Sequence, residues 1–266
     1  MSKGTQTGFE VVIPEVTFKS VQSDLGKYMR KDSKSRTEDA NGELFIIGAV
    51  NKNIHPTPFN IYIKHLEIND GVRLTAFFTP DDTLYFSNAL DNEKAIAIKK
   101  YLRDFALQEY RGVVKDELTV QRRRLTNLES EFESLIKAKQ RSEKNINEAK
   151  RDIESNNRSL IDFNKLDTTK SEEILRQKDV VSRLKGTGGE EEKLAAKKLK
   201  SLESEKRKLE KESEKTARDT DNQNIRIEDE KRRIEKNLND QESKKKEIEK
   251  QKDKTKSVEE KLGNIL

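Results

Sequence analysis

The sequence predicts a small α+β head, with an antiparallel sheet and two helices, followed by a long antiparallel α-helical coiled-coil hairpin. Residues 113–266 lack proline, and 40 Lys/Arg and 35 Asp/Glu among these 154 residues leave too few apolar side chains for a globular core. All four prolines and thirteen of the fifteen aromatic residues lie before residue 113. We therefore divide the chain into a head, residues 1–112, and an arm, residues 113–266.

Residues spaced alternately three and four apart form one seam along each half of the arm. This a/d heptad spacing is typical of a left-handed coiled coil. The first seam comprises Val114, Leu118, Gln121, Leu125, Leu128, Phe132, Leu135, Lys139, Ser142, Ile146, Ala149, Ile153, Asn156, Leu160, Phe163, Asp167, Lys170, Ile174, Gln177, Val181 and Leu184. The second comprises Ala195, Leu199, Leu202, Lys206, Leu209, Ser213, Thr216, Thr220, Gln223, Ile227, Glu230, Ile234, Asn237, Gln241, Lys244, Ile248, Gln251, Thr255, Val258, Leu262 and Ile265. The polar middle of both seams favours either a simple two-helix arm of marginal stability or an arm that splays and accepts a further helix.

A helix-stop and helix-start signal separates the two seams. Lys185 and Gly186 suit a helix C-terminus, and Thr187-Gly188-Gly189-Glu190 has the spacing of a capping box. The two halves are nearly equal in length, so we predict an intrachain hairpin that turns at residues 185–190. The alternative is one continuous rod that pairs with another chain, in which each glycine would cost about 1 kcal/mol.

The head alternates apolar and polar residues in the manner of antiparallel strands. Pro14 closes the first strand, and Asn69-Asp70-Gly71 marks a hairpin turn. The expected elements are a strand at 9–13, a helix at 16–30, a loop at 31–42, strands at 44–50, 59–64 and 74–78, a short strand at 84–86, and a helix capped by Asn92. We expect both helices to pack on one face of the sheet.

The second head helix runs into the arm at Gly112. Ile98, Leu102 and Phe105 form its expected buried face, whereas the arm seam begins at Val114 on a different face. The buried side therefore changes at this junction, either through a bend at Gly112 or because a straight helix changes partners.

No combination of residues predicts a catalytic, cofactor or metal site. His55 lies in a proline-bounded turn and His65 at a strand end, and neither has metal-ligand spacing around it. The chain has no cysteine and no phosphate-binding glycine motif. No apolar run has the length of a transmembrane segment. We expect a non-enzymatic protein with no cofactor and no bound metal.

Nucleic acid is a weaker alternative as a partner. Tyr62, Phe77 and Tyr85 would stack on bases if they faced outward. However, the head carries 15 Lys/Arg and 15 Asp/Glu, so it lacks the basic character of such modules. The formal net charge of +5 falls on the arm, where it is a weak bias.

From Leu102-Arg103-Asp104-Phe105-Ala106-Leu107-Gln108 into Val114-Lys115-Asp116-Glu117-Leu118 and the charged arm, the chain resembles uncharacterised proteins of Bacteroidota. These pair a small α+β head with a C-terminal Lys/Glu-rich coiled coil. The resemblance implies a secretion leader and an envelope or periplasmic location, and it implies no activity. If Met1 is the true start of the protein, the expected location is the cytoplasm instead.

The expected function is structural: the arm contacts a protein partner or further copies of this chain, which would give a homo-oligomer. The candidate contact residues at its tip are Lys185, Gly186, Thr187, Gly188, Gly189 and Glu190. A first alternative is a periplasmic holdase chaperone of the prefoldin or Skp type. In that alternative, apolar residues outside the seam would face a cavity, namely Ile136, Ile161, Leu166, Leu175 and Val180. A second is nonspecific binding of nucleic acid.

Overall fold

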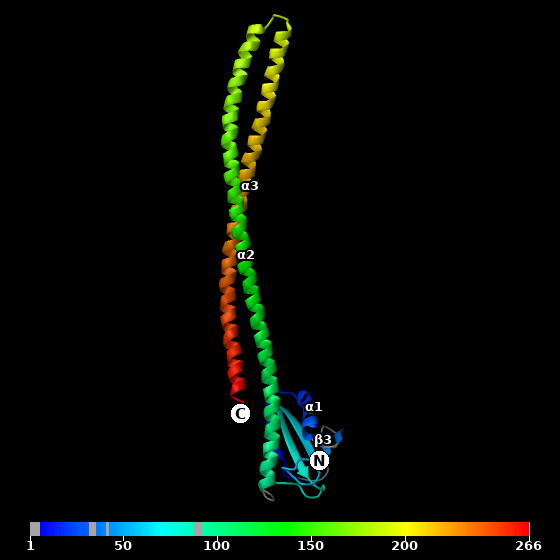
Figure 1. Ribbon diagram of the computed structural model, residues 1–266. Coiled ribbons are helices and arrows are strands. Elements are labelled where there is room, and N and C mark those ends of the chain that lie inside the picture. Colours follow the sequence, from blue (N-terminus) through cyan, green and yellow to red (C-terminus); the bar gives the residue numbers. More distant parts are fainter. Residues whose placement is uncertain (1–5, 32–35, 41–42, 88–91, 266) are drawn as a thin grey trace. The chain divides into compact units, whose positions relative to one another are not determined.

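The computed structural model describes residues 6–31, 36–40, 43–87 and 92–265 (Figure 1). The chain divides into two compact units. One unit contains residues 1–126 together with 249–266, and the other contains residues 127–248. The base of the hairpin thus belongs to the same unit as the head.

The head sheet has five antiparallel strands in the order β1-β5-β4-β3-β2. The strands are β1 (Phe9–Pro14), β2 (Arg36–Ala40), β3 (Glu43–Ala49), β4 (Phe59–Ile68) and β5 (Gly71–Thr79). As predicted, β1 ends at Pro14, and a two-residue turn joins β4 to β5.

Two strand predictions in the head are wrong. The segment 31–42 contains β2, which pairs with β3 at the edge of the sheet, although we expected a loop. Main-chain pairing with β3 holds this polar edge strand in the sheet. Such pairing does not require alternating hydrophobic residues, so the sequence pattern does not reveal the strand. Residues 84–86 form no strand, although the Phe86 amide donates a hydrogen bond to the Phe78 carbonyl at 3.0 Å.

Gly71 begins β5 in a conformation that requires glycine. Its φ is +146°, and a Cβ at this position would lie 2.1 Å from the Ile13 carbonyl oxygen. Any side chain here would therefore separate β1 from β5.

The main core lies between one face of the sheet and both helices, as predicted. Helix α1 (Phe18–Met29) begins with a capping box between Thr17 and Ser20. Its buried side chains meet those of the first turns of α2 (Asn92–Leu184), which starts with Asn92 as its first helical residue. The helical side chains in this core include Val21, Leu25, Met29, Ala95, Ile98, Leu102 and Phe105.

A second, smaller cluster lies on the opposite face of the sheet. Tyr62 and Phe77 are neighbours in the β4–β5 register, and Tyr85 packs against them. All three side chains are buried, with Phe45 partly buried beside them. The Tyr62 hydroxyl donates a hydrogen bond of 2.5 Å to Asp82 Oδ1, and burial together with this carboxylate raises the pKa of Tyr62. These rings are therefore not available as base-stacking platforms.

Helix α2 continues unbroken through Gly112, and its buried face changes partners there. Before Gly112 the helix packs in the main core, whereas Val114 and Leu118 pack against Val258 and Ile265 from the far end of the chain. The end of helix α3 (Glu190–Gly263), together with Ile265 just after it, supplies this second surface. Of the two predicted alternatives, the structure therefore shows one continuous helix that changes packing partners at Gly112.

Helices α2 and α3 form the predicted antiparallel hairpin, and they run side by side in Figure 1. Every predicted seam position on both helices is buried or partly buried. Most positions between them are exposed. The heptad pattern therefore identified the contact surface along both helices. None of the helices in the described part of the chain has an apolar stretch that could span a bilayer.

Candidate functional site

The tip of the hairpin is a tight turn with two glycines in the left-handed region. Helix α2 ends at Leu184 and α3 begins at Glu190, in agreement with the predicted turn. Gly186 has φ +90° and follows the last helical turn as a C′ glycine does. Gly188 has φ +64°.

Glu192, in the first turn of the second helix, binds the backbone of the preceding turn, in place of the predicted pairing of Thr187 with Glu190. The Glu192 carboxylate accepts hydrogen bonds from the amides of Gly188 (2.9 Å) and Gly186 (3.4 Å). The Thr187 hydroxyl instead donates to the Leu184 carbonyl at 2.9 Å. Since α3 begins at Glu190, Gly189 occupies the N-cap position, and a glutamate at N3 is Glu192.

Replacing Gly188 with alanine is expected to destabilise the hairpin by about 1–2 kcal/mol, because an L-residue is strained at positive φ. Gly189 is a matched control: no positive φ is found there, and a Cβ meets nothing within 4 Å at either glycine. Urea unfolding followed by circular dichroism measures the difference. Equal stability of the Gly188→Ala and Gly189→Ala variants would contradict this turn geometry.

Polar seam residues form hydrogen bonds between the helices. Asn145 Nδ2 donates to Glu230 Oε1 at 2.9 Å, and Gln177 Nε2 donates to the Ala195 carbonyl at 3.0 Å. Asn237 Nδ2 donates to the Leu135 carbonyl at 3.0 Å. Because polar pairs at core positions fix the alignment of coiled-coil helices, these contacts set the register of the hairpin.

Glu230 makes the stability of the hairpin depend on pH. Its side chain is almost fully buried, and hydrogen bonds from Ser142 and Asn145 lower its pKa below the ordinary value of 4.5. A carboxyl with a lowered folded-state pKa contributes stability above its unfolded pKa, and this contribution is lost as the pH falls through the folded pKa. We therefore expect Glu230→Gln to be about 1 kcal/mol less stable than wild type at pH 7.

At pH 3 that difference should shrink, since the contribution of Glu230 is progressively lost as the pH falls from the ordinary pKa of 4.5 through the lowered folded-state pKa. Urea midpoints of both proteins at pH 7 and pH 3 measure this change directly. A constant difference at the two pH values would show that Glu230 is not a titrating contributor.

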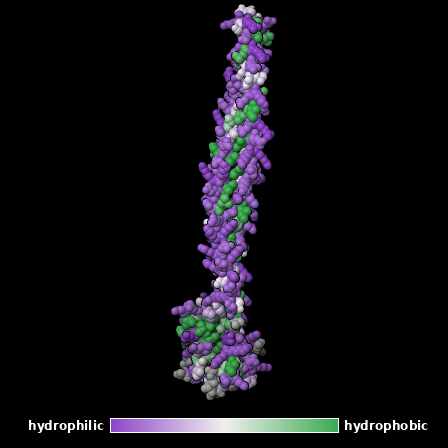
Figure 2. Space-filling view, turned by 90° about the vertical axis from the view of Figure 1, so that its left-hand side faces the viewer, coloured by the Kyte–Doolittle hydropathy of each residue, from purple (hydrophilic) through white to green (hydrophobic). Residues whose placement is uncertain are grey.

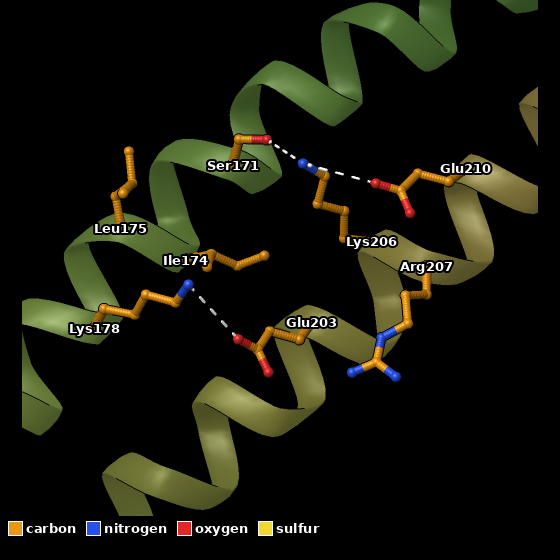
Figure 3. Close-up of a pocket in the computed structure, with 8 residues that line it drawn as sticks. All are labelled: Ser171, Ile174, Leu175, Lys178, Glu203, Lys206, Arg207 and Glu210. Carbon is orange, nitrogen blue, oxygen red and sulfur yellow. Dashed lines mark hydrogen bonds and ion pairs between the residues drawn. The ribbon is translucent and has the colours of Figure 1, made fainter.

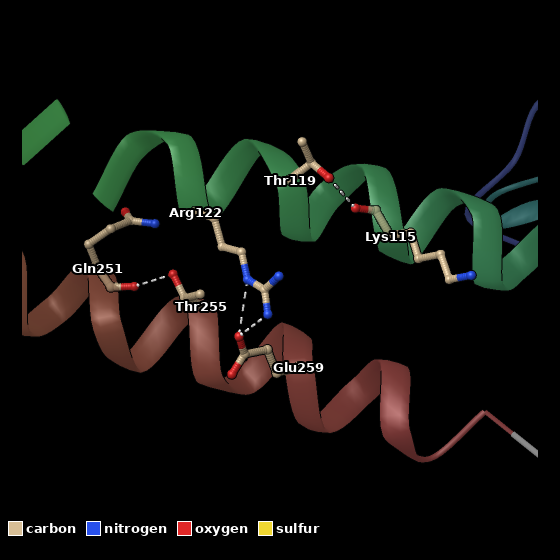
Figure 4. A network of polar contacts seen from close by, with 6 residues as sticks. All are labelled: Lys115, Thr119, Arg122, Gln251, Thr255 and Glu259. Atoms are coloured by element: carbon tan, nitrogen blue, oxygen red, sulfur yellow. Dashed lines mark hydrogen bonds and ion pairs between the residues drawn. The ribbon is translucent and has the colours of Figure 1, made fainter. Parts of the chain in front are cut away.

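Figure 4 shows the polar contacts at the base of the hairpin. The Arg122 guanidinium donates two hydrogen bonds to Glu259 Oε1, at 3.2 Å and 2.8 Å. Thr255 Oγ1 donates to the Gln251 carbonyl on the same helix at 2.9 Å. Gln251 Nε2 in turn donates to Gln121 Oε1 at 2.7 Å. The bonds of Arg122 to Glu259 and of Gln251 to Gln121 join α2 and α3 next to the cluster of Val114 and Val258.

A shallow groove of about 470 Å³ lies between α2 and α3 nearer the tip (Figure 3). Lys206 bridges the helices there, with its Nζ 2.8 Å from Ser171 Oγ and 3.8 Å from Glu210 Oε1. Lys178 lies 3.9 Å from Glu203. Leu175 and Arg207 also line the groove, and Figure 3 marks no hydrogen bond or ion pair to Arg207.

The histidines occupy structural positions. His65 stacks on Phe18 with ring centroids 3.4 Å apart. The His55 ring nitrogen Nδ1 lies 2.9 Å from Thr57 Oγ1 within its turn. Across the described residues, no group of His, Cys, Asp or Glu side chains has the arrangement of a metal site.

The surface of the hairpin is hydrophilic with scattered apolar patches, as Figure 2 shows. The tip residues and these patches are its candidate contact surfaces. No protein-family model matches the chain, and a search of curated proteins finds no significant similarity to it.

Proposed function

We propose that the protein is a non-enzymatic interaction protein whose helical hairpin binds protein partners. One observation carries this proposal. Large apolar side chains outside the seam are 42 to 64% exposed on the hairpin: Ile161, Leu166, Leu175, Val180, Leu194, Ile225 and Leu238.

These side chains are not needed for pairing α2 with α3, because the seam already supplies that contact. Ile161 and Leu175 are fourteen residues apart, and so are Leu166 and Val180. Two residues separated by two heptads lie on the same face of a coiled-coil helix. Each pair therefore presents apolar contacts in line along the hairpin, as a helical partner would require.

Photo-crosslinking in cells tests the proposal. A benzoylphenylalanine residue replaces Leu166 or Leu194 on the hairpin, and Leu66 or Leu84 serves as an equally exposed leucine of the head. We expect specific protein adducts from the two hairpin positions. Adducts from the head positions alone, or none at any position, would refute an interaction role for the hairpin.

A holdase chaperone is the second candidate, and the same exposed side chains favour it. Of the residues that this role requires, Ile161, Leu166, Leu175 and Val180 are exposed, whereas Ile136 is only partly so. The candidate carries with it the envelope location that the resemblance implies. It predicts that the protein suppresses light scattering from a heat-denatured client enzyme, and that Leu166→Ser with Val180→Ser weakens this effect. Unchanged scattering at equimolar protein would eliminate the holdase role.

A further inference from the structure

One face of α2 carries a second stripe with heptad spacing. The stripe consists of Asn157, Ile161, Asn164, Thr168, Ser171 and Leu175, which are spaced alternately four and three apart. All six residues are uncharged, in an arm where about half of the residues are charged. They flank the seam rather than occupy it, and all except the partly buried Ser171 are exposed.

The same face of α2 is charged nearer the head. The equivalent positions there include Lys115, Arg122, Glu129, Glu143 and Lys150. Seven of the twelve equivalent positions from Lys115 to Glu154 are charged, whereas none of the six stripe positions is. A row of this spacing without charge is what a helix presents to another helix.

The stripe is nearly symmetric about Thr168. Asn164 and Ser171 lie on either side of it, followed outward by the apolar Ile161 and Leu175. A second stripe running in the opposite direction would therefore place small polar residues against small polar residues. It would also place Ile161 of each copy against Leu175 of the other.

We propose that this stripe is a self-association surface, on which a second copy of the chain docks antiparallel with a twofold axis beside Thr168. This inference rests on the proposed interaction role of the hairpin and names one of its partners. An interface with such an axis is isologous, because the same patch is used by both copies.

Charges on α3 select this arrangement. Lys206 contacts Ser171, and Gln177 contacts the Ala195 carbonyl, so Arg207 and Glu210 lie level with Thr168. Both residues line the groove, across from the α2 residues labelled in Figure 3. Across a twofold axis at this level, Arg207 of each copy faces Glu210 of the other. Within the described residues Arg207 has no ion-pair partner of its own.

Each carboxylate at the interface also has a cation within its own chain, and for Glu210 this is Lys206 at 3.8 Å. Glu203 lies 3.9 Å from Lys178, and Glu214 lies 3.5 Å from Arg218. These pairs offset the repulsion between Glu203 of one copy and Glu214 of the other. A parallel second copy would instead set the apolar stripe against Glu203, Glu210 and Glu214, which disfavours that orientation.

Disulfide trapping tests the orientation, and the absence of cysteine from the chain makes each introduced thiol unique. Thr168→Cys should form a disulfide-linked dimer under mild oxidation. Thr169→Cys is the matched control, because both threonines are exposed and both hydroxyls donate to the carbonyl four residues earlier, at 3.0 Å and 3.1 Å. Ile161→Cys alone and Leu175→Cys alone should stay monomeric, whereas their mixture should crosslink.

Equal crosslinking of the Thr168→Cys and Thr169→Cys variants would overturn the proposal. Efficient crosslinking of Ile161→Cys with itself would overturn it too, because a twofold axis beside Thr168 keeps the two Ile161 positions apart.

Sedimentation of the full chain tests the energetics. Leu175→Lys and Arg207→Glu are each expected to raise the dimer dissociation constant about tenfold. Adding Glu210→Arg to Arg207→Glu should restore it, because the ion pair re-forms with reversed sign. A wild-type protein that stays monomeric up to about 1 mM would overturn the inference. If Leu166 and Leu194 still crosslink to another protein in that case, the proposed function survives; if they do not, both fail.

Discussion

Replacing Ile98 with alanine is expected to destabilise the head by about 2–5 kcal/mol, as large-to-small substitutions in packed cores do. Ile98 is fully buried in the main core, where α2 meets α1 and the sheet. Removing the outer carbon atoms of Ile98 loses the free energy gained by burying them. It also leaves a cavity that the sheet cannot fill without distorting its strand register. This is a large fraction of the stability of an ordinary small domain.

Ile96 provides a close control, because it lies two residues earlier on the same helix and is 59% exposed, against 0% for Ile98. Ile96→Ala should change stability by less than about 0.5 kcal/mol. Hydrogen exchange at β4 and β5 amides reports on the head without interference from the hairpin. If both variants lose the same protection, α2 does not pack on the sheet through the face that contains Ile98.

Val114→Asp is expected to detach the end of α3 from α2. Val114 is fully buried at the base of the hairpin, against Val258 and Ile265. A carboxylate introduced there would lie among apolar side chains, and burying its charge costs several kcal/mol. Detaching the end of α3 costs less free energy than keeping this carboxylate buried. We expect the amides of residues 249–265 to lose about a hundredfold of their exchange protection, which corresponds to about 3 kcal/mol.

Val120→Asp is the matched control, since Val120 lies on the same helix and is 63% exposed. It should leave the protection of residues 249–265 unchanged. Unchanged protection in Val114→Asp as well would mean that α3 does not return to the base of α2. That result would contradict the hairpin and the interaction role that depends on it.

The candidate surfaces were only partly predictable. The turn at residues 185–190 follows from its glycines, but the bonds of Glu192 to the turn amides depend on which residue begins α3. The uncharged stripe on α2 is visible in the sequence once the seam is assigned. Its relation to Arg207 and Glu210 became clear only from the contacts that align the two helices.

The sequence by itself determined the hairpin. In each heptad the spacing of apolar residues indicates which side of the helix is buried, and this signal repeats along both helices. It also determined the β4–β5 hairpin, through alternation and the turn before Gly71. Only the tertiary structure decided that Arg36–Ala40 is a strand, and that Tyr62, Phe77 and Tyr85 are buried together. The physical reason is the same in both cases. Edge pairing and the covering of a second sheet face depend on segments distant in the chain, and local residue pattern does not encode those contacts.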